Sequence, residues 1–275
     1  MAVAPFPKPT AVRSDDPDDD NRIAQTEPEP LEDGRMSFLD HLDELRKRLI
    51  ASVYALLIGC VIAFFFVSRI QAFIFVPLHQ ALGGQDFIYT RGFEPFMLMM
   101  KTGALAGLLL ASPFIIWQLW LFIAPGLYAN EKRFAIPFVV FSSVFFLLGA
   151  AFSHYVAFPW TWAFFKSWET EYVKFLPDIQ EAFSTYVKMI LAFGLIFQMP
   201  TLVFSLARMG LVTAGWLARN TKYAVLIIFI VAAVISPGTD VVSQAMMAGP
   251  MLALYGISIL VAWIFAKKKT RELTA

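Results

Sequence analysis

Charge and cysteine are both scarce in this chain. Only 16% of its 275 residues are Asp, Glu, Lys or Arg, whereas 58% are hydrophobic. An ordinary soluble domain carries roughly 25% charged residues, so the composition indicates a membrane protein with several spans. A single cysteine, Cys60, excludes an internal disulfide and lies within an apolar run, which indicates an inert, packed thiol.

The sequence motifs of soluble enzymes are missing as well. The chain has no zinc-ligand spacing, no P-loop, no glycine-rich dinucleotide fingerprint and no Gly-x-Ser-x-Gly elbow. We therefore expect a protein that is not an enzyme, with no catalytic residues, no metal and no cofactor. Nothing in the sequence points to nucleic acid as a partner.

Both ends of the chain differ from its middle. Residues 1–35 are rich in proline and in Asp and Glu, and without an apolar run they cannot form a secretory signal or bury enough surface to fold. We expect a disordered acidic tail there, a membrane domain over residues 36–266, and a basic tail over residues 267–275.

The spacing of charged residues predicts an all-α integral membrane protein with six transmembrane helices. A helix rises ~1.5 Å per residue and the hydrocarbon core is ~30 Å thick, so about 20 residues suffice for one crossing. The uncharged runs cover residues 49–68, 102–130, 134–165, 189–207, 223–239 and 241–266. The fifth run is the shortest and Ser236-Pro237-Gly238-Thr239-Asp240 separates it from the sixth, so we expect short fifth and sixth spans.

Six spans place both termini on one side of the membrane, and the positive charges select that side. The segments on the side of the termini carry Arg46, Lys47, Arg48, Lys132, Arg133, Arg208, Arg219, Lys222, Lys267, Lys268, Lys269 and Arg271. The opposite segments carry only Arg69, Arg91, Lys101, Lys166, Lys174 and Lys188. Since Lys and Arg concentrate in cytoplasmic segments, both termini are expected in the cytoplasm.

A short amphipathic helix is predicted just before the first span. Leu39, Leu42, Leu45 and Leu49 share one helical face, while Asp43–Lys47 and Glu44–Arg48 are i,i+4 pairs in the favourable order. Two interpretations of its charges are open. They form a solvated face, or Glu44 has a role in recognition.

A charged hairpin is predicted over residues 119–133, between the second and third spans. Pro125-Gly126 is a strong turn signal, and Trp120, Phe122 and Tyr128 suit the depth at which lipid tails meet headgroups. The simplest interpretation is a loop with an aromatic anchor. The alternative is a binding site for a cationic ligand, because Glu131 is an acid on the side richer in Lys and Arg.

Three polar side chains in or near the spans stand out. Gln198 lies in mid-span just before Pro200, where its amide can satisfy local backbone groups or meet a polar part of a ligand. Asp240 and Gln244 flank the outer turn between the last two spans, where a turn and helix cap is the simplest interpretation. His154 is expected to be a packing histidine near the outer interface.

These motifs together resemble the TatC family, the multi-span core subunit of the twin-arginine protein translocase. The resemblance covers about residues 36–266. It rests on His41-Leu42-Asp43-Glu44-Leu45-Arg46-Lys47-Arg48-Leu49, on the hairpin over residues 119–133, on Phe193 to Pro200 and on Ser236 to Gln244, in matching order.

The resemblance implies a receptor that binds the Arg-Arg motif of signal peptides at the cytoplasmic face. Glu44 and Glu131 match the family's acids that bind the arginine pair, Phe122 matches an aromatic of that site, and Arg46 matches an arginine that shapes it. The apolar stretch of the signal is then expected on a concave face near Gln198, where many family members carry Glu. A role that needs a titrating acid there is not expected in this chain.

The resemblance also implies partners and a location. Single-span TatA-type and TatB-type subunits are expected to dock at the fifth and sixth spans and at Asp240 and Gln244, in an oligomeric complex of the bacterial plasma (inner) membrane. Transport of folded proteins would draw on the proton-motive force.

The residues bear on two other classes of function. A proton-coupled secondary transporter of a small solute needs coupling carboxylates or broken-helix repeats in mid-membrane, and the uncharged runs contain no Asp or Glu. An intramembrane protease needs a nucleophile paired with a base, and no serine motif accompanies His154.

Overall fold

The computed structural model describes residues 38–84, 87–123, 132–238 and 240–265, with side chains described for 41–80, 82–84, 87–122, 138–238 and 240–265. The chain divides after Asp43. Residues 1–43 form one unit, of which the structure describes the first residues of α1, and residues 44–275 form the other.

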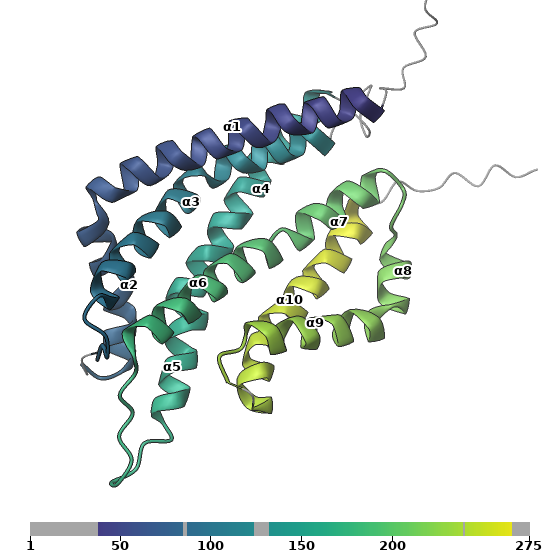
Figure 1. The fold of residues 1–275 in the computed structure, drawn as a ribbon. Helices are drawn as coiled ribbons and strands as arrows, with labels where there is room; N and C mark the ends of the chain where they lie inside the picture. The colour runs from purple at the N-terminus through teal and green to yellow at the C-terminus, as the bar shows by residue number, and fades with distance from the viewer. Residues whose placement is uncertain (1–37, 85–86, 124–131, 239, 266–275) are drawn as a thin grey trace, which may run out of the picture. The chain divides into compact units, whose positions relative to one another are not determined.

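Within the described ranges the chain is almost entirely helical (Figure 1). The elements are α1 (Phe38–Phe65), α2 (Val67–Ala81), α3 (Glu94–Ile123), α4 (Lys132–Phe152), η3 (Ser153–Ala157), α5 (Phe158–Lys166), α6 (Ile179–Ile196), α7 (Met199–Arg208), α8 (Ala214–Arg219), α9 (Thr221–Ile235) and α10 (Val241–Phe265). Long apolar segments form helices because a helix satisfies its backbone polar groups internally, as the bilayer requires. The predicted all-α class is confirmed.

Five helical segments in the described part are long and apolar enough to cross a membrane, and α9 is a shorter apolar helix. The 15 residues of α9 rise about 22 Å, against a hydrocarbon core of about 30 Å. The prediction of a short fifth span is therefore confirmed. The prediction of a short sixth span is wrong, because α10 has 25 residues and begins directly after Asp240, so that it uses the whole apolar run.

Two of the spanning segments are not continuous α-helices. The third passes from α4 through the π-turn η3 into α5 and ends at Lys166. In a π-turn the backbone hydrogen bonds join residues five apart instead of four apart. Pro159, which has no backbone N–H to donate, lies two residues after the turn. The fourth breaks at Phe197-Gln198, between α6 and α7, with Pro200 near the start of α7. Proline is tolerated there because the first turn of a helix has no need of that N–H.

Small residues allow the helices to approach one another closely. A Cβ added at Gly149 of α4 would lie 2.4 Å from the carbonyl oxygen of Phe193 on α6. Where α10 packs against α7 and α9, the fully buried residues include Ala207, Ala232 and Ala248. Packing through small residues is the usual basis of helix association within membranes.

The connections between the spanning helices contain short structured parts. The segment after α1 forms the helix α2, and Gly83 and Gly84 follow it with positive φ angles of 65° and 82°. Ile88 and Asp178 then form an isolated parallel bridge between the α2–α3 and α5–α6 connections. Asp178 also caps α6, since its Oδ1 accepts from the backbone N–H groups of Gln180 at 2.8 Å and Glu181 at 3.1 Å.

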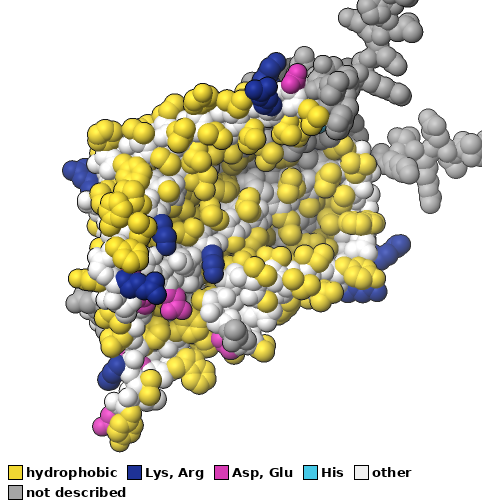
Figure 2. All heavy atoms as spheres, in the orientation of Figure 1, with side chains coloured by type: hydrophobic (Ala, Val, Ile, Leu, Met, Phe, Trp, Pro, Cys, Tyr) yellow, Lys and Arg dark blue, Asp and Glu magenta, His cyan; other side chains and the backbone are white. Residues whose placement is uncertain are grey.

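Hydrophobic side chains cover most of the face drawn in Figure 2. The described part of the chain exposes many large hydrophobic side chains, including Tyr54, Phe65 and Trp263. Exposed apolar side chains of this number are expected where lipid, rather than water, is the surrounding solvent.

Candidate functional site

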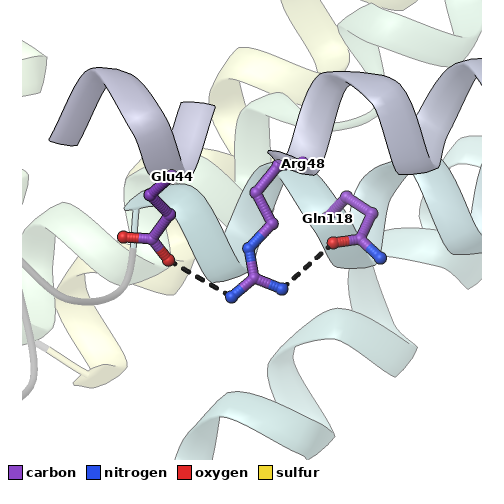
Figure 3. Close-up of polar contacts among 3 residues, drawn as sticks. All are labelled: Glu44, Arg48 and Gln118. Carbon is purple, nitrogen blue, oxygen red and sulfur yellow. Dashed lines mark hydrogen bonds and ion pairs between the residues drawn. The ribbon is translucent and has the colours of Figure 1, made fainter. Parts of the chain in front are cut away.

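A polar cluster joins α1 to α3 at the cytoplasmic side predicted from the charges. Arg48 lies between two acceptors (Figure 3): its Nη2 is 3.2 Å from Oε1 of Glu44, and its Nη1 donates across 3.2 Å to Oε1 of Gln118. Glu44 and Arg48 are one helical turn apart on α1, whereas Gln118 is on α3. The cluster therefore combines a local pair with a contact that is distant in sequence.

The three side chains differ in exposure. The side chain of Arg48 is 33% exposed and that of Glu44 is 19% exposed, while Gln118 is buried. A carboxylate that is largely removed from water attracts a charged donor strongly, because water screens the interaction less. The remaining exposure of Glu44 gives a ligand access to it.

Glycine makes possible a close contact between α1 and α3 farther along the same two helices. A Cβ added at Gly59 would lie 2.5 Å from the carbonyl oxygen of Gly107, and one added at Gly107 would lie 2.6 Å from the backbone of Cys60. Gly103, one turn before Gly107, has the ring of Phe64 against it. This small-xxx-small pattern brings the two backbones together.

The predicted site residues on α1 and α3 differ in whether they belong to the cluster and in how exposed they are. Glu44 is in the cluster, whereas Arg46 is exposed on α1, and it is Arg48 that contacts Glu44. Phe122 is half-buried near the end of α3. Glu131 and most of the predicted hairpin lie outside the described residues, so the pairing of Glu44 with Glu131 stays a prediction.

Gln118 is the member of the cluster that the sequence patterns do not predict. It is a polar residue within an otherwise apolar run, and that alone was an available signal, since buried polar groups in a span have to find partners. Its partner is 70 positions away in the chain, which no local pattern indicates.

Gln198 lies at the break between α6 and α7 and contacts α4. Its Nε2 donates to the backbone carbonyl of Ser142 at 2.8 Å, and the Oγ of Ser142 accepts from Nε1 of Trp120 at 3.1 Å. These contacts link α3, α4 and the α6–α7 break. Gln198 thus satisfies a backbone group, but that group lies on α4 and is not the local one beside Pro200 that the sequence suggested.

Asp240 and Gln244 hold the turn between α9 and α10. Asp240 accepts from the backbone N–H of Ser243 at 2.7 Å and from its hydroxyl at 2.6 Å, which is a helix cap. These hydrogen bonds lower the pKa of the Asp240 carboxyl from its ordinary value. Gln244 donates from Nε2 to the carbonyl of Phe229 at 2.8 Å, so it ties α10 to α9.

His154 is a packed residue, as predicted. It is buried on the π-turn, its Nδ1 is 3.0 Å from the hydroxyl of Tyr186, and the ring of Phe73 stacks on it with centroids 4.4 Å apart. Among the described residues, no group of three or more His, Cys, Asp or Glu side chains could hold a metal ion.

Comparison with known proteins gives a consistent result. The family model for the Sec-independent protein translocase protein (TatC) matches residues 40–250. The chain is 42% identical over 242 residues to the Sec-independent protein translocase protein TatC of Desulforapulum autotrophicum, covering 88% of this chain and 89% of that one. It is 39% identical over 241 residues to the TatC protein of Koribacter versatilis, covering 86% and 89%.

Solved structures agree with the sequence relatives. The crystal structure of the twin arginine translocase receptor TatC matches with a TM-score of 0.71 and 35% identity, covering 81% of this chain and 97% of that chain. A crystal structure of this receptor in DDM matches with a TM-score of 0.74 and the same identity, covering 81% and 99%.

Proposed function

Because the chain belongs to the TatC family of Sec-independent protein translocase proteins, we propose that it binds the Arg-Arg motif of signal peptides at the cytoplasmic membrane surface through Glu44 and Glu131. The protein is a multi-pass membrane protein whose family acts in protein translocation. The solved relatives are named as receptors of the twin-arginine translocase, and the proposal extends that role to this chain.

The observation that carries the proposal is that Glu44 already accepts a guanidinium. Its Oε1 is 3.2 Å from Nη2 of Arg48, and its side chain retains 19% exposure. A guanidinium has a planar fork of donors that matches both oxygens of a carboxylate, whereas an ammonium is a single point of charge. A peptide with two adjacent arginines therefore suits a site with two carboxylates better than a peptide with two lysines.

The same proposal assigns the other predicted residues. Phe122 supplies an aromatic surface beside the arginines, and Arg46 shapes the site from the exposed side of α1. The apolar stretch of the signal lies on a concave face that includes Gln198. Since Nε2 of Gln198 is used on Ser142, its Oε1 is the atom that can accept from a polar group of the signal.

Single-span TatA-type and TatB-type subunits would pack on α9 and α10 near Asp240 and Gln244. The large side chains Val234 and Val241 are exposed on either side of that turn, which supports a helix-packing surface there. In this arrangement both termini face the cytoplasm, the complex is oligomeric and lies in the bacterial inner membrane, and the proton-motive force drives the transport of folded cargo. The chain itself catalyses no chemical reaction.

The alternative considered from the sequence, a proton-coupled transporter of a small solute, is not favoured by the comparisons. The two relatives reported above are translocase proteins and match 88% and 86% of this chain.

The test is equilibrium binding of a synthetic twin-arginine peptide to the purified full-length chain. Glu44→Gln, which keeps the shape of the side chain but removes its charge, is expected to weaken binding about 10- to 100-fold, the size of a lost charge-assisted hydrogen bond. Glu171→Gln, on the exposed connection between α5 and α6, is the matched control and should bind as the parent does. Equal binding by the Glu44→Gln variant and the parent would refute the site.

A further inference from the structure

We propose that Arg48 competes with the arginines of the signal peptide for Glu44, and that Gln118 sets the strength of this competition by holding Arg48 partly away from the carboxylate. The inference rests on the proposed function, because it concerns how the Glu44 site recognises its peptide. It makes Arg48 and Gln118 residues that set the affinity of the Glu44 site.

The guanidinium of Arg48 is divided between two acceptors. Its Nη2 is 3.2 Å from Glu44 and its Nη1 is 3.2 Å from Gln118, on opposite sides of the fork (Figure 3). A paired guanidinium and carboxylate usually form two parallel hydrogen bonds of about 2.7–2.9 Å. The observed contact is single and longer, so Arg48 engages Glu44 with only part of its binding capacity.

Gln118 is well placed to act as a tether. It is buried with 8% exposure on α3, and Gly107 of the same helix lies against Gly59 of α1. Its amide oxygen is a neutral acceptor and therefore attracts a guanidinium less strongly than a carboxylate does. Gln118 thus draws Arg48 aside without retaining it completely.

This arrangement leaves Glu44 open to a ligand. Its second carboxylate oxygen points away from Arg48 in Figure 3. An arriving guanidinium can bind that oxygen first and then take the place of Nη2 of Arg48 on Oε1, while Arg48 stays on Gln118. The exchange replaces one long contact by a pair of parallel hydrogen bonds, which a guanidinium can form and an ammonium cannot.

The competition lowers the affinity of the site for every cationic peptide. Any peptide that binds Oε1 of Glu44 has to displace Nη2 of Arg48, and this displacement costs the same free energy whichever peptide arrives. Only a guanidinium then gains two parallel hydrogen bonds, so an Arg-Arg peptide overcomes the competitor at a lower concentration than a Lys-Lys peptide.

The experiment measures dissociation constants of an Arg-Arg peptide and of the matched Lys-Lys peptide for the purified full-length chain. Arg48→Gln should tighten Arg-Arg binding about two- to fivefold, the effect of removing one ion pair near the surface, and should tighten Lys-Lys binding by a similar factor. Gln118→Leu should weaken Arg-Arg binding, because Arg48 then turns fully onto Glu44. Arg69→Gln, on the exposed side of α2, is the control and should change neither constant.

The double variant separates tethering from a merely structural role. Gln118→Leu should have no effect on binding once Arg48→Gln is present, because nothing is left to tether. Gln118→Asn, which keeps an amide but shortens its reach, should behave as Gln118→Leu does and guards against a folding defect. Weaker Arg-Arg binding by Arg48→Gln, or an equal effect of Gln118→Leu in both backgrounds, would overturn the inference. If Glu44→Gln weakens binding about 10- to 100-fold in the same assay, such a result leaves the proposed function intact.

Discussion

The side-chain amide of Gln198 donates to the backbone carbonyl of Ser142 across 2.8 Å, and this bond ties the break between α6 and α7 to the middle of α4. Gln198→Leu keeps the approximate volume but removes the donor. We expect it to lower the free energy of unfolding by about 0.5–1.5 kcal/mol, as for a typical intramolecular hydrogen bond. Thermal unfolding in detergent measures the difference. An unchanged unfolding temperature would mean that the bond contributes nothing to stability.

The contact between Gly59 and Gly107 gives a prediction for the position of α1. Gly107→Ala places a methyl group 2.6 Å from the backbone of Cys60, so α1 has to move away from α3. The expected cost is about 1–3 kcal/mol, as for other overpacked sites. The thiol of Cys60 lies in the same contact. In the Gly107→Ala variant it should therefore react faster with a membrane-permeant maleimide than in the parent protein.

Gly256→Ala on α10 is the matched control for that experiment. A Cβ added at Gly256 has no other atom within 4 Å. The control should leave both the unfolding temperature and the labelling of Cys60 unchanged. Equal labelling of Cys60 in the Gly107→Ala variant and the parent would contradict the close packing of α1 on α3.

Much of the fold was predictable because the membrane makes sequence patterns simple. Uncharged runs mark the spans, and the shortness of α9 followed from the position of Asp240 and the turn before it. The same turn predicts short helices on both of its sides, and this prediction is wrong for α10. Asp240 caps α10, which begins directly after the turn.

The polar cluster was predictable only in part, because its members come from different helices. The pair of Glu44 and Arg48 has the i,i+4 spacing of a helix and was expected. The contact of Arg48 with Gln118 depends on the packing of α1 on α3, which hydrophobic periodicity does not determine. The spacing of Gly103 and Gly107 was the local signal for that packing, since small residues four apart favour close helix contacts.

The cap at Asp240 gives a prediction for the dependence of stability on pH. Hydrogen bonds from Ser243 lower the pKa of this carboxyl in the folded protein below its ordinary value of 3.8. The stabilisation is therefore fully present above pH 3.8 and is lost as the pH falls through the lower folded value. Asp240→Ala should lower the unfolding temperature at pH 7 and at pH 5 by the same amount, and the difference from the parent should shrink at pH 3.

Asp240→Asn provides the control for charge in that series. The amide keeps an oxygen that can accept from the backbone N–H of Ser243 but does not titrate. Its unfolding temperature should lie between those of the parent and Asp240→Ala at neutral pH. A difference between the parent and Asp240→Ala that stays constant from pH 7 to pH 3 would contradict the role of the charged carboxylate.

The buried pair of His154 and Tyr186 joins the π-turn to α6. The two side chains are 3.0 Å apart at Nδ1 and the hydroxyl oxygen, and both are buried. Tyr186→Phe removes the hydroxyl and leaves Nδ1 of His154 without that partner. A buried polar atom that loses its partner costs about 1–3 kcal/mol, which thermal unfolding should detect. Tyr223→Phe, at an exposed position on α9, should have no such effect.

A double variant decides whether that cost comes from the hydrogen bond or from packing. In a His154→Phe background the polar atom is absent, so Tyr186→Phe should cost little or nothing further. If Tyr186→Phe costs the same in both backgrounds, the two residues are energetically independent and the π-turn is held by the stacking of aromatic rings such as Phe73 instead. If the cost disappears, the bond between the π-turn and α6 is the contact that stabilises this part of the third span.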